Sequence, residues 1–279
     1  MANKAAWLKN PKERPLQIDD APMPTPGPDE VVIRNRAVAI NPVDWAIQAT
    51  GMFPISYPFI GGHDASGDIT AVGSAVTDFK VGDRVVAFLN PTGDGNRSNG
   101  AFQLFFKTGV NAIAKLPNNV SYAEASVLPM GLGVAASGLF QADTLALPFP
   151  QVDPTPNDKV VLIWGGGSSM GACAIQLAKG AGFKVAATAN GHNLESMKNL
   201  GADYVFDYTK DSVIEDVLAA LQGADFAGAF CAIIEPEVIK QCAQIASKLG
   251  GNKFVANVRV PAMPPVEGMP SDTKTACCK

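Results

Sequence analysis

Cysteine is scarce in this chain and unevenly placed. No cysteine lies before residue 173, and no two are separated by the two residues of a CxxC pair. A structural zinc site usually takes four closely spaced cysteine or histidine ligands, so the sequence excludes a structural zinc lobe. Nor do the cysteines have the spacing of a disulfide framework, which predicts a reducing, cytoplasmic location. The cysteines are Cys173, Cys231, Cys242, Cys277 and Cys278.

Long runs of one charge are also missing. The 22 basic and 26 acidic side chains give a net charge of −4 and are spread along 279 residues. This distribution lacks the basic patch that a nucleic-acid surface or an anionic membrane requires. Residues 1–15 have no apolar stretch long enough for a signal peptide or a membrane span. We therefore expect neither nucleic acid nor a membrane as a partner.

Histidine occurs only twice, as His63 and His192. A catalytic zinc needs about three protein ligands, and Asp44 and Asp64 favour harder cations when no nitrogen or sulfur ligand helps them. We therefore predict no metal. His63, in the motif GGHDASG (61–67), is then either a polar residue of a cleft or a histidine packed at a strand end. A zinc alcohol dehydrogenase remains an alternative that rests on His63 and Asp64 alone.

The first part of the chain has the alternating, β-branched pattern of strands. The clearest segments are 31–40, 66–76 and 82–89, and clusters of glycine and proline separate them. This pattern predicts an antiparallel or barrel-like β domain that ends at about residue 127.

Residues 128–279 follow a different pattern, in which buried apolar strands alternate with amphipathic helices. Such alternation predicts a parallel, doubly wound sheet and an α/β fold for this part. After a first helix at 129–142, the expected strands are 159–164, 184–188, 204–208, 229–234 and 253–258, and the expected helices between them are 171–182, 193–200, 212–222 and 236–249.

A glycine-rich turn joins a strand to a helix within residues 160–182. Gly166-x-Ser168-x-x-Gly171 is the dinucleotide-binding fingerprint with serine in place of the middle glycine. The Ser168 hydroxyl is expected to donate to a phosphate oxygen, and the helix N-terminus adds a partial positive charge. The alternative is an ordinary packing turn. The candidate cofactor-binding residues here are Gly165, Gly166, Gly167, Ser168, Ser169, Met170 and Gly171.

The choice of cofactor depends on the end of the next strand, where NAD sites usually carry an acidic residue for the ribose 2′-hydroxyl. This chain has Asn190 and His192 there, and no acid before Glu195. Both can donate to a 2′-phosphate, and no carboxylate repels it. The segment therefore favours NADP(H), unless it is a solvated loop that contacts nothing.

Several motifs resemble, in order, the zinc-independent branch of the medium-chain dehydrogenase/reductase superfamily, which includes quinone oxidoreductases and fungal trans-acting enoyl reductases. The resemblance implies a GroES-like β-barrel catalytic domain at 1–127, a Rossmann NADP-binding domain at 128–279, and an active site in the cleft between them. It also implies that Asn41 stands where zinc-dependent relatives have a ligand cysteine. The motifs are Asn41–Trp45, Gly61–Gly67, Val81–Val85, Leu128–Pro129, Gly165–Gly171 and Leu200–Asp203.

The same resemblance implies a reaction in which NADPH passes hydride to an enone, an enoyl thioester or a quinone. Asn41 and Asp44 would line the nicotinamide end of the cleft, and His63 is expected beside it. These three are the candidate catalytic residues. Tyr208 matches a tyrosine that packs near the adenosine 2′-phosphate.

The chain departs from the fungal enoyl reductases at Ala46, where they commonly have lysine, and at Val134, where a threonine is expected. It also ends several tens of residues before family members do, so we expect a Rossmann domain shortened at its C-terminus. These departures leave open a catalytically impaired NADPH-binding accessory protein, for example a partner of a polyketide synthase. The substrate and the oligomeric state, which includes a homodimer, stay undetermined.

Overall fold

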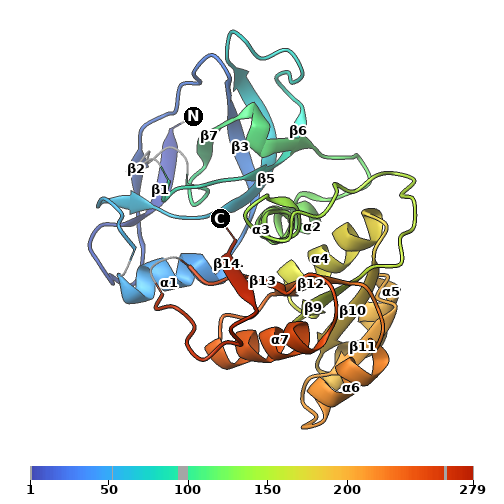
Figure 1. The fold of residues 1–279 in the computed structure, drawn as a ribbon. Helices are drawn as coiled ribbons and strands as arrows, with labels where there is room; N and C mark the ends of the chain where they lie inside the picture. Colours follow the sequence, from blue (N-terminus) through green and yellow to red (C-terminus); the bar gives the residue numbers. More distant parts are fainter. Residues whose placement is uncertain (1, 52, 94–99, 261–262, 279) are drawn as a thin grey trace. The chain divides into compact units, whose positions relative to one another are not determined.

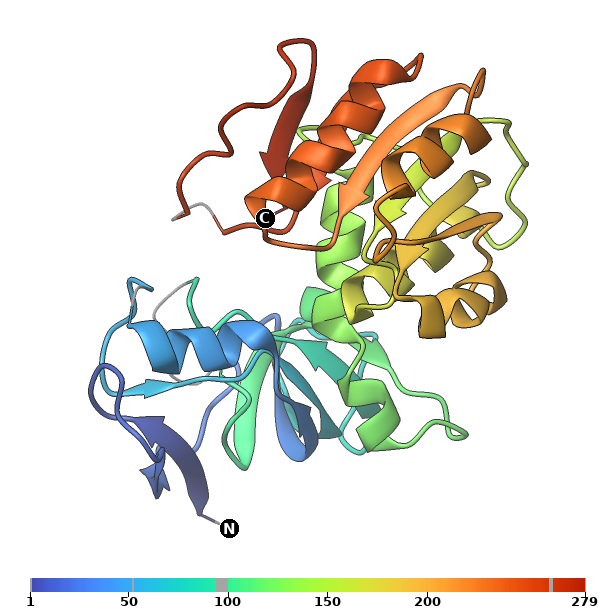
Figure 2. The same cartoon turned by 90° about the horizontal axis from the view of Figure 1, so that it is seen from below.

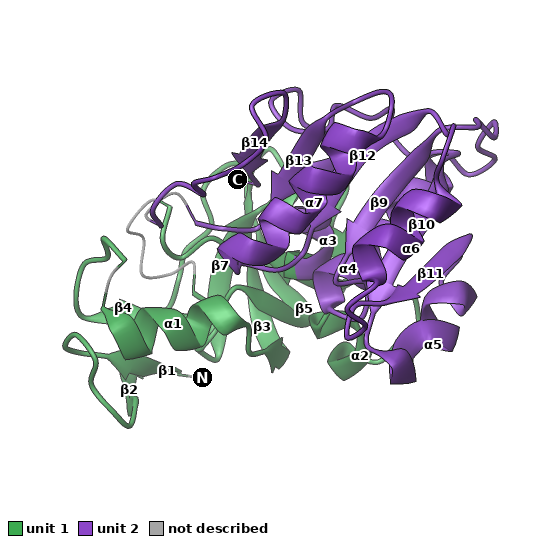
Figure 3. Ribbon diagram, turned by 60° about the horizontal axis from the view of Figure 1, so that its bottom comes forward, with its two compact units in different colours: residues 1–130 green, residues 131–279 purple. Residues whose placement is uncertain are grey.

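The computed structural model describes residues 2–51, 53–93, 100–260 and 263–278. By its internal contacts the chain divides into two compact units, residues 1–130 (unit 1) and residues 131–279 (unit 2) (Figure 3). The division falls a few residues after the predicted boundary at 127, inside the first turn of helix α3 (Pro129–Phe140).

Unit 1 is built from antiparallel strands. One sheet has the order β7-β3-β5-β6-β8, and a smaller one has the order β2-β1-β4 (Figure 1). The predicted antiparallel domain is thus confirmed, and its core contains Val31, Ile33 and Phe106, none of which is exposed. The strands are β1 (Asn3–Leu8), β2 (Gln17–Ala21), β3 (Glu30–Ala39), β4 (Phe59–Ile60), β5 (Asp64–Val72), β6 (Arg84–Phe88), β7 (Phe105–Gly109) and β8 (Ile113–Lys115).

Short helices connect these strands. Helix α1 (Pro42–Thr50) begins with proline at a position where no backbone N–H is needed, and it ends at Gly51 in the left-handed conformation (φ 63°). Helix α2 (Tyr122–Ser126) begins with a capping box. A short 3-10 helix, η2 (Val110–Ala112), precedes β8.

The helical stretch at residues 122–140 has the length and apolar composition that could cross a membrane. In the structure it forms two helices, α2 and α3, with Val127 and Leu128 between them. Ala135 and Leu139 of α3 are fully buried in the core of unit 2. This burial is what the core helix of a globular unit shows.

Unit 2 contains a six-stranded parallel sheet in the order β11-β10-β9-β12-β13-β14, which confirms the predicted doubly wound arrangement. The strands are β9 (Val160–Trp164), β10 (Lys184–Ala189), β11 (Tyr204–Asp207), β12 (Phe226–Cys231), β13 (Phe254–Asn257) and β14 (Lys274–Cys277). Strand β14 was not predicted, and it pairs with β13 at the edge of the sheet.

Helices cover both faces of this sheet (Figures 1 and 2). Val161 and Ile163 of β9 pack with α3 and α4, whereas Leu162 and Trp164 pack with α6 and α7. Because alternate residues of one strand face opposite layers, both faces must be apolar, which explains the continuous hydrophobic run. The helices are α4 (Ser169–Gly180), η3 (Gly191–Asn193), α5 (Leu194–Asn199), α6 (Val213–Ala220) and α7 (Pro236–Lys248).

Candidate active site

The glycine-rich turn of unit 2 follows β9 directly. Gly165 has a φ of 84°, which a residue with a side chain rarely adopts. Ser168 is the N-cap of α4: its hydroxyl donates to the Gly165 carbonyl at 2.8 Å and accepts the Gly171 N–H at 3.0 Å. The hydroxyl proton, which we expected to bond a phosphate, is therefore used by the Gly165 carbonyl, while the hydroxyl oxygen caps the first turn of the helix.

Two further glycines of the turn have different roles. A Cβ on Gly171 would lie 2.2 Å from the Gly165 carbonyl oxygen, so only glycine lets α4 start this close to the turn. Gly167 is exposed. The N–H groups of Ser169 and Met170, at the first positions of α4, have no acceptor within the helix, and they lie at its positive end. The turn thus offers what a diphosphate needs.

The strand order places this turn at a topological switch point. β9 lies between β10 and β12, so the chain leaves β9 in one direction and returns to its other side. A Cβ on Gly165 would lie 2.9 Å from Cγ1 of Ile233, which follows β12. The carboxyl ends of the two strands therefore meet here, which is the usual ligand position in a doubly wound sheet.

The residues expected near the adenosine follow two neighbouring strands, Asn190 and His192 after β10 and Tyr208 after β11. Asn190 accepts the His192 backbone N–H through Oδ1 at 3.2 Å and thereby starts the short helix η3. Among the described residues, no acceptor bonds its side-chain NH₂. His192 is exposed, and Tyr208 is 43% exposed. All three are accessible to a ligand.

The structure also brings a carboxylate, that of Asp207, close to the loop that contains Asn190 and His192. Asp207 ends β11 and pairs in register with Ala189, so a Cβ on Gly191 would lie 2.6 Å from Asp207 Oδ2. Hydrogen bonds from Thr209, helped by Lys210, lower the pKa of Asp207, which keeps it ionised. The expectation of a loop without a nearby acid is therefore wrong, but Lys210 supplies a cation beside that acid.

The three candidate catalytic residues come together in unit 1. His63 and Asp44 are 5% and 8% exposed, and His63 Nδ1 lies 2.6 Å from Asp44 Oδ1. Asp44 Oδ2 accepts the Asn41 backbone N–H at 2.8 Å. His63 directly precedes β5, so it is packed at a strand end and also takes part in a polar network.

Asp64, the first residue of β5, completes this network. Its Oδ2 accepts the Asn41 side-chain N–H at 3.0 Å, and its Oδ1 accepts the Met130 N–H at 2.9 Å. Burial raises the pKa of Asp64 to about 6, against the opposite effect of these two hydrogen bonds. The sequence presents Asp64 as a possible metal ligand, whereas the structure makes it a partner of Asn41 and Met130. Its place in a run of small buried residues was the signal that it is an ionisable core residue.

Unit 1 contains one histidine and no cysteine, so Asp44 and Asp64 have one nitrogen ligand and no sulfur ligand to help them bind zinc. Each of the four carboxylate oxygens of Asp44 and Asp64 already accepts a hydrogen bond. Throughout the described part of the chain, no three His, Cys, Asp or Glu side chains are grouped as metal ligands.

The two positions that depart from the enoyl reductases are filled without polar contacts of their side chains. Ala46 lies on α1, where its carbonyl accepts the Thr50 hydroxyl. Val134 lies on α3 and packs against the core of unit 2.

Family models match both units. Residues 27–139 match the alcohol dehydrogenase GroES-like domain, and residues 169–270 match a domain described as zinc-binding dehydrogenase.

Individual proteins are similar over most of the chain. The dehydrogenase azaJ of Aspergillus niger is 41% identical over 263 residues, which cover 91% of this chain and 76% of that protein. The trans-enoyl reductase himH of Aspergillus japonicus is 37% identical over 251 residues, with 90% and 72% covered. An alcohol dehydrogenase superfamily protein from Novosphingobium aromaticivorans superposes with a TM-score of 0.79 at 28% identity, with 99% and 78% covered.

Proposed function

The chain belongs to the medium-chain dehydrogenase/reductase superfamily, and on this premise we propose that it is an NADPH-dependent reductase that works without a metal on activated C=C bonds or quinones. That it is an oxidoreductase follows from the family. The finer proposal is supported by its similarity to a trans-enoyl reductase. The observation that carries it is the buried network of Asn41, Asp44, His63 and Asp64, in which Asp44 holds the His63 ring in place.

NADPH fits the glycine-rich turn of unit 2. We propose that the N–H groups of Ser169 and Met170 hold the diphosphate, with Gly167 leaving room for its approach. Asn190, His192 and Tyr208 would hold the adenosine 2′-phosphate, with Lys210 adding positive charge. Bound there, the cofactor would supply a hydride to the β-carbon of the acceptor.

The side chains of unit 1 would supply the proton that must accompany the hydride. Asp44 binds His63 at Nδ1 and fixes the orientation of the ring, so Nε2 is the nitrogen that can exchange a proton. We propose that His63 delivers this proton to the α-carbon of an enone or enoyl thioester, or to a quinone oxygen. Asn41 contributes by fixing both carboxylates, and general acid catalysis of this kind is worth roughly 10²- to 10⁴-fold in rate.

The acceptors we propose are small molecules, and the five free cysteines fit a reducing cytosol. Ala46 and Val134 favour a second candidate, a protein that binds NADPH but has lost turnover and serves as the partner of a synthase.

A direct test mixes the protein with NADPH and a panel of enones, enoyl thioesters and quinones, and follows the loss of NADPH absorbance. We expect turnover, and we expect His63→Gln to lower kcat by roughly 10²-fold or more while the Kd for NADPH stays unchanged. Tight NADPH binding without turnover of any acceptor would indicate the accessory protein. Absence of binding would overturn both candidates.

A further inference from the structure

We propose that an apolar pocket in unit 1 holds the hydrophobic substituent of the acceptor, and that this substituent is a single six-membered ring or a chain of about four to six carbons. The inference rests on the proposed function and names the substrate class more closely. All the residues that form the pocket belong to unit 1, so the pocket is defined within that unit alone.

The size of the pocket limits what it can hold. Its volume is about 170 Å³, and its walls include Leu8, Ile47, Phe59 and Phe102. An apolar cavity of about 150 Å³ in another protein stays dry and binds benzene, so one ring fills a space of this size. A bicyclic acceptor would not fit entirely.

The chemistry of the walls favours an apolar group. Asp44 and Gln48 are the charged and amide side chains that line the pocket, and both are already engaged. Asp44 bonds His63 and Asn41, and Gln48 donates to the Glu13 carbonyl at 2.9 Å. A polar ligand would lose its water without gaining these partners. An aliphatic or aromatic group has no such cost.

The pocket also borders the proton-handling network. Asp44 lines it and at the same time holds His63 at 2.6 Å. A group bound in the pocket therefore lies against the residue that orients the imidazole. This contact is what a substrate-binding pocket should have, because it couples binding to the position of the proton donor.

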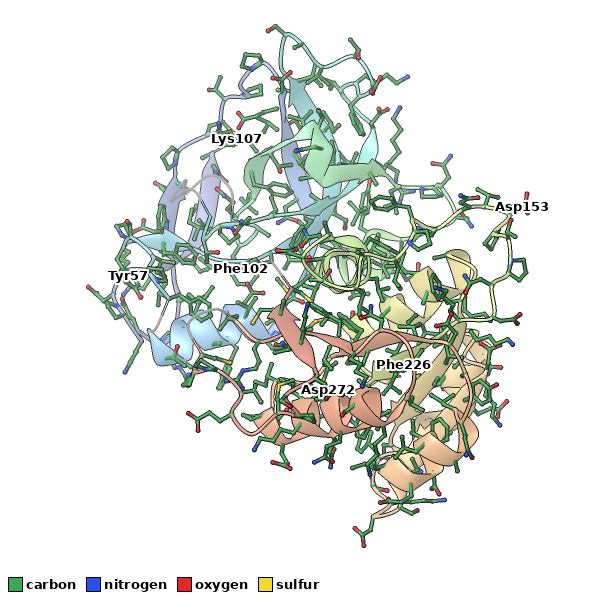
Figure 4. All side chains as sticks on the ribbon, viewed as in Figure 1. Tyr57, Phe102, Lys107, Asp153, Phe226 and Asp272 are labelled. Atoms are coloured by element: carbon green, nitrogen blue, oxygen red, sulfur yellow. The ribbon has the colours of Figure 1, made fainter. Side chains whose placement is uncertain are left out.

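One end of the pocket continues into a second hollow. Leu16, Ile40 and Phe102 line both the pocket and a neighbouring groove of about 620 Å³ (Phe102 is labelled in Figure 4). Ile40 is 78% exposed, so the groove is open to solvent. A chain longer than the pocket would pass Phe102 and gain less from each further carbon.

Gly61 allows the pocket to be made smaller without strain. A Cβ there would lie 3.5 Å from Phe102 and 3.6 Å from Phe59, which is ordinary van der Waals contact. Gly61→Ala thus removes space at the wall, and Leu16→Ala adds space. Gly250→Ala is the matched control, because a Cβ at Gly250, in unit 2, meets no atom within 4 Å.

The experiment compares trans-enones that carry methyl, propyl, pentyl or phenyl groups, in one series on the β-carbon and in another on the carbonyl carbon. In one of the series we expect kcat/KM to rise roughly two- to fourfold per methylene up to pentyl, with phenyl at least as good. Gly61→Ala should lower the values for pentyl and phenyl about tenfold relative to the value for methyl, Leu16→Ala should favour the larger groups, and Gly250→Ala should alter none of these ratios. Equal values across both series, or equal losses for all groups, would overturn the proposal.

A second measurement separates this inference from the proposed function. The phenyl enone is titrated against tryptophan fluorescence without NADPH, with Trp45→Phe as the reference, because Trp45 lines the pocket. We expect saturable quenching that Trp45→Phe removes and Gly61→Ala weakens about tenfold. This result would support the pocket even if no acceptor were reduced. No saturable change would overturn it even in an active enzyme.

Discussion

Asn41 donates its side-chain N–H to Asp64 Oδ2 across 3.0 Å, and so connects two segments that lie 23 positions apart in the chain. Its backbone N–H donates to Asp44 Oδ2 at 2.8 Å. One residue therefore holds two buried carboxylates in place, and the stability of unit 1 should depend on the protonation of Asp64.

The first prediction concerns pH. The folded pKa of Asp64, about 6, lies above its ordinary value of 3.8. The folded state therefore binds more protons than the unfolded state between these values, and the stabilisation from this group is complete below pH 4 and lost as pH rises through 6. The loss is about 2 kcal/mol. Urea unfolding of the wild type and of Asp64→Asn at pH 4 and pH 7 measures it.

The difference between the two proteins is the informative quantity, because other groups titrate equally in both. Asp68, for example, has the same contacts in both proteins. Its pKa is lowered to about 2 despite partial burial, because Tyr122 and two arginines donate hydrogen bonds to it, so in the folded state it is ionised at both pH values. The interpretation fails if the variant loses as much stability between pH 4 and pH 7 as the wild type.

The second prediction concerns the glycine-rich turn. Gly167→Ala should leave the melting temperature nearly unchanged, because the new Cβ would lie 3.3 Å from the nearest atom, in the exposed Asn193 side chain. It should nevertheless weaken NADPH binding about tenfold, which corresponds to ~1.4 kcal/mol, since a methyl group obstructs the phosphates. Gly171→Ala, by contrast, should destabilise the fold itself. If Gly167→Ala bound NADPH with unchanged affinity, the diphosphate would not bind at the glycine-rich turn.

The third prediction concerns the choice between NADPH and NADH. Asn190→Asp keeps the Oδ1 atom that caps η3 but adds a negative charge. We expect the ratio of the Kd values for NADPH and NADH to rise about tenfold, because the carboxylate repels a 2′-phosphate and accepts a 2′-hydroxyl. Asp207→Asn should shift the ratio in the opposite direction. Isothermal titration with both cofactors gives the ratio. An unchanged ratio in Asn190→Asp would show that the adenosine does not bind at this loop.

The fourth prediction concerns metal removal. Dialysis against a chelator should leave turnover within experimental error of the untreated protein, because unit 1 offers zinc one histidine and no cysteine. Elemental analysis should find zinc far below one ion per chain. A loss of activity that added zinc restores would refute metal independence.

Sequence reasoning located the regular elements well where a local pattern carried the information. Residues 160–164 are all apolar, which predicts a buried strand. They are all apolar because both faces of β9 pack against helices. Strand β14 (Lys274–Cys277) was missed because its residues have no apolar pattern, and its conformation comes from pairing with β13.

Contacts between distant segments were beyond such reasoning. The approach of Asp207 to Gly191 follows from the register of β10 and β11, which no spacing in the chain encodes. In the same way, His63 meets Asp44 although 19 positions separate them in the chain. The sequence predicted these residues as candidates, but only the fold pairs them.

The double role of Asn41 also restricts how this protein can change over generations. A cysteine at position 41, as the resemblance implies for zinc-dependent relatives, would take the side-chain donor from Asp64 and leave a buried carboxylate short of a partner. That intermediate would be destabilised before any ion could compensate for it. A zinc site built on position 41 would therefore require a second substitution, at position 64, to remove the acceptor that is left without its donor.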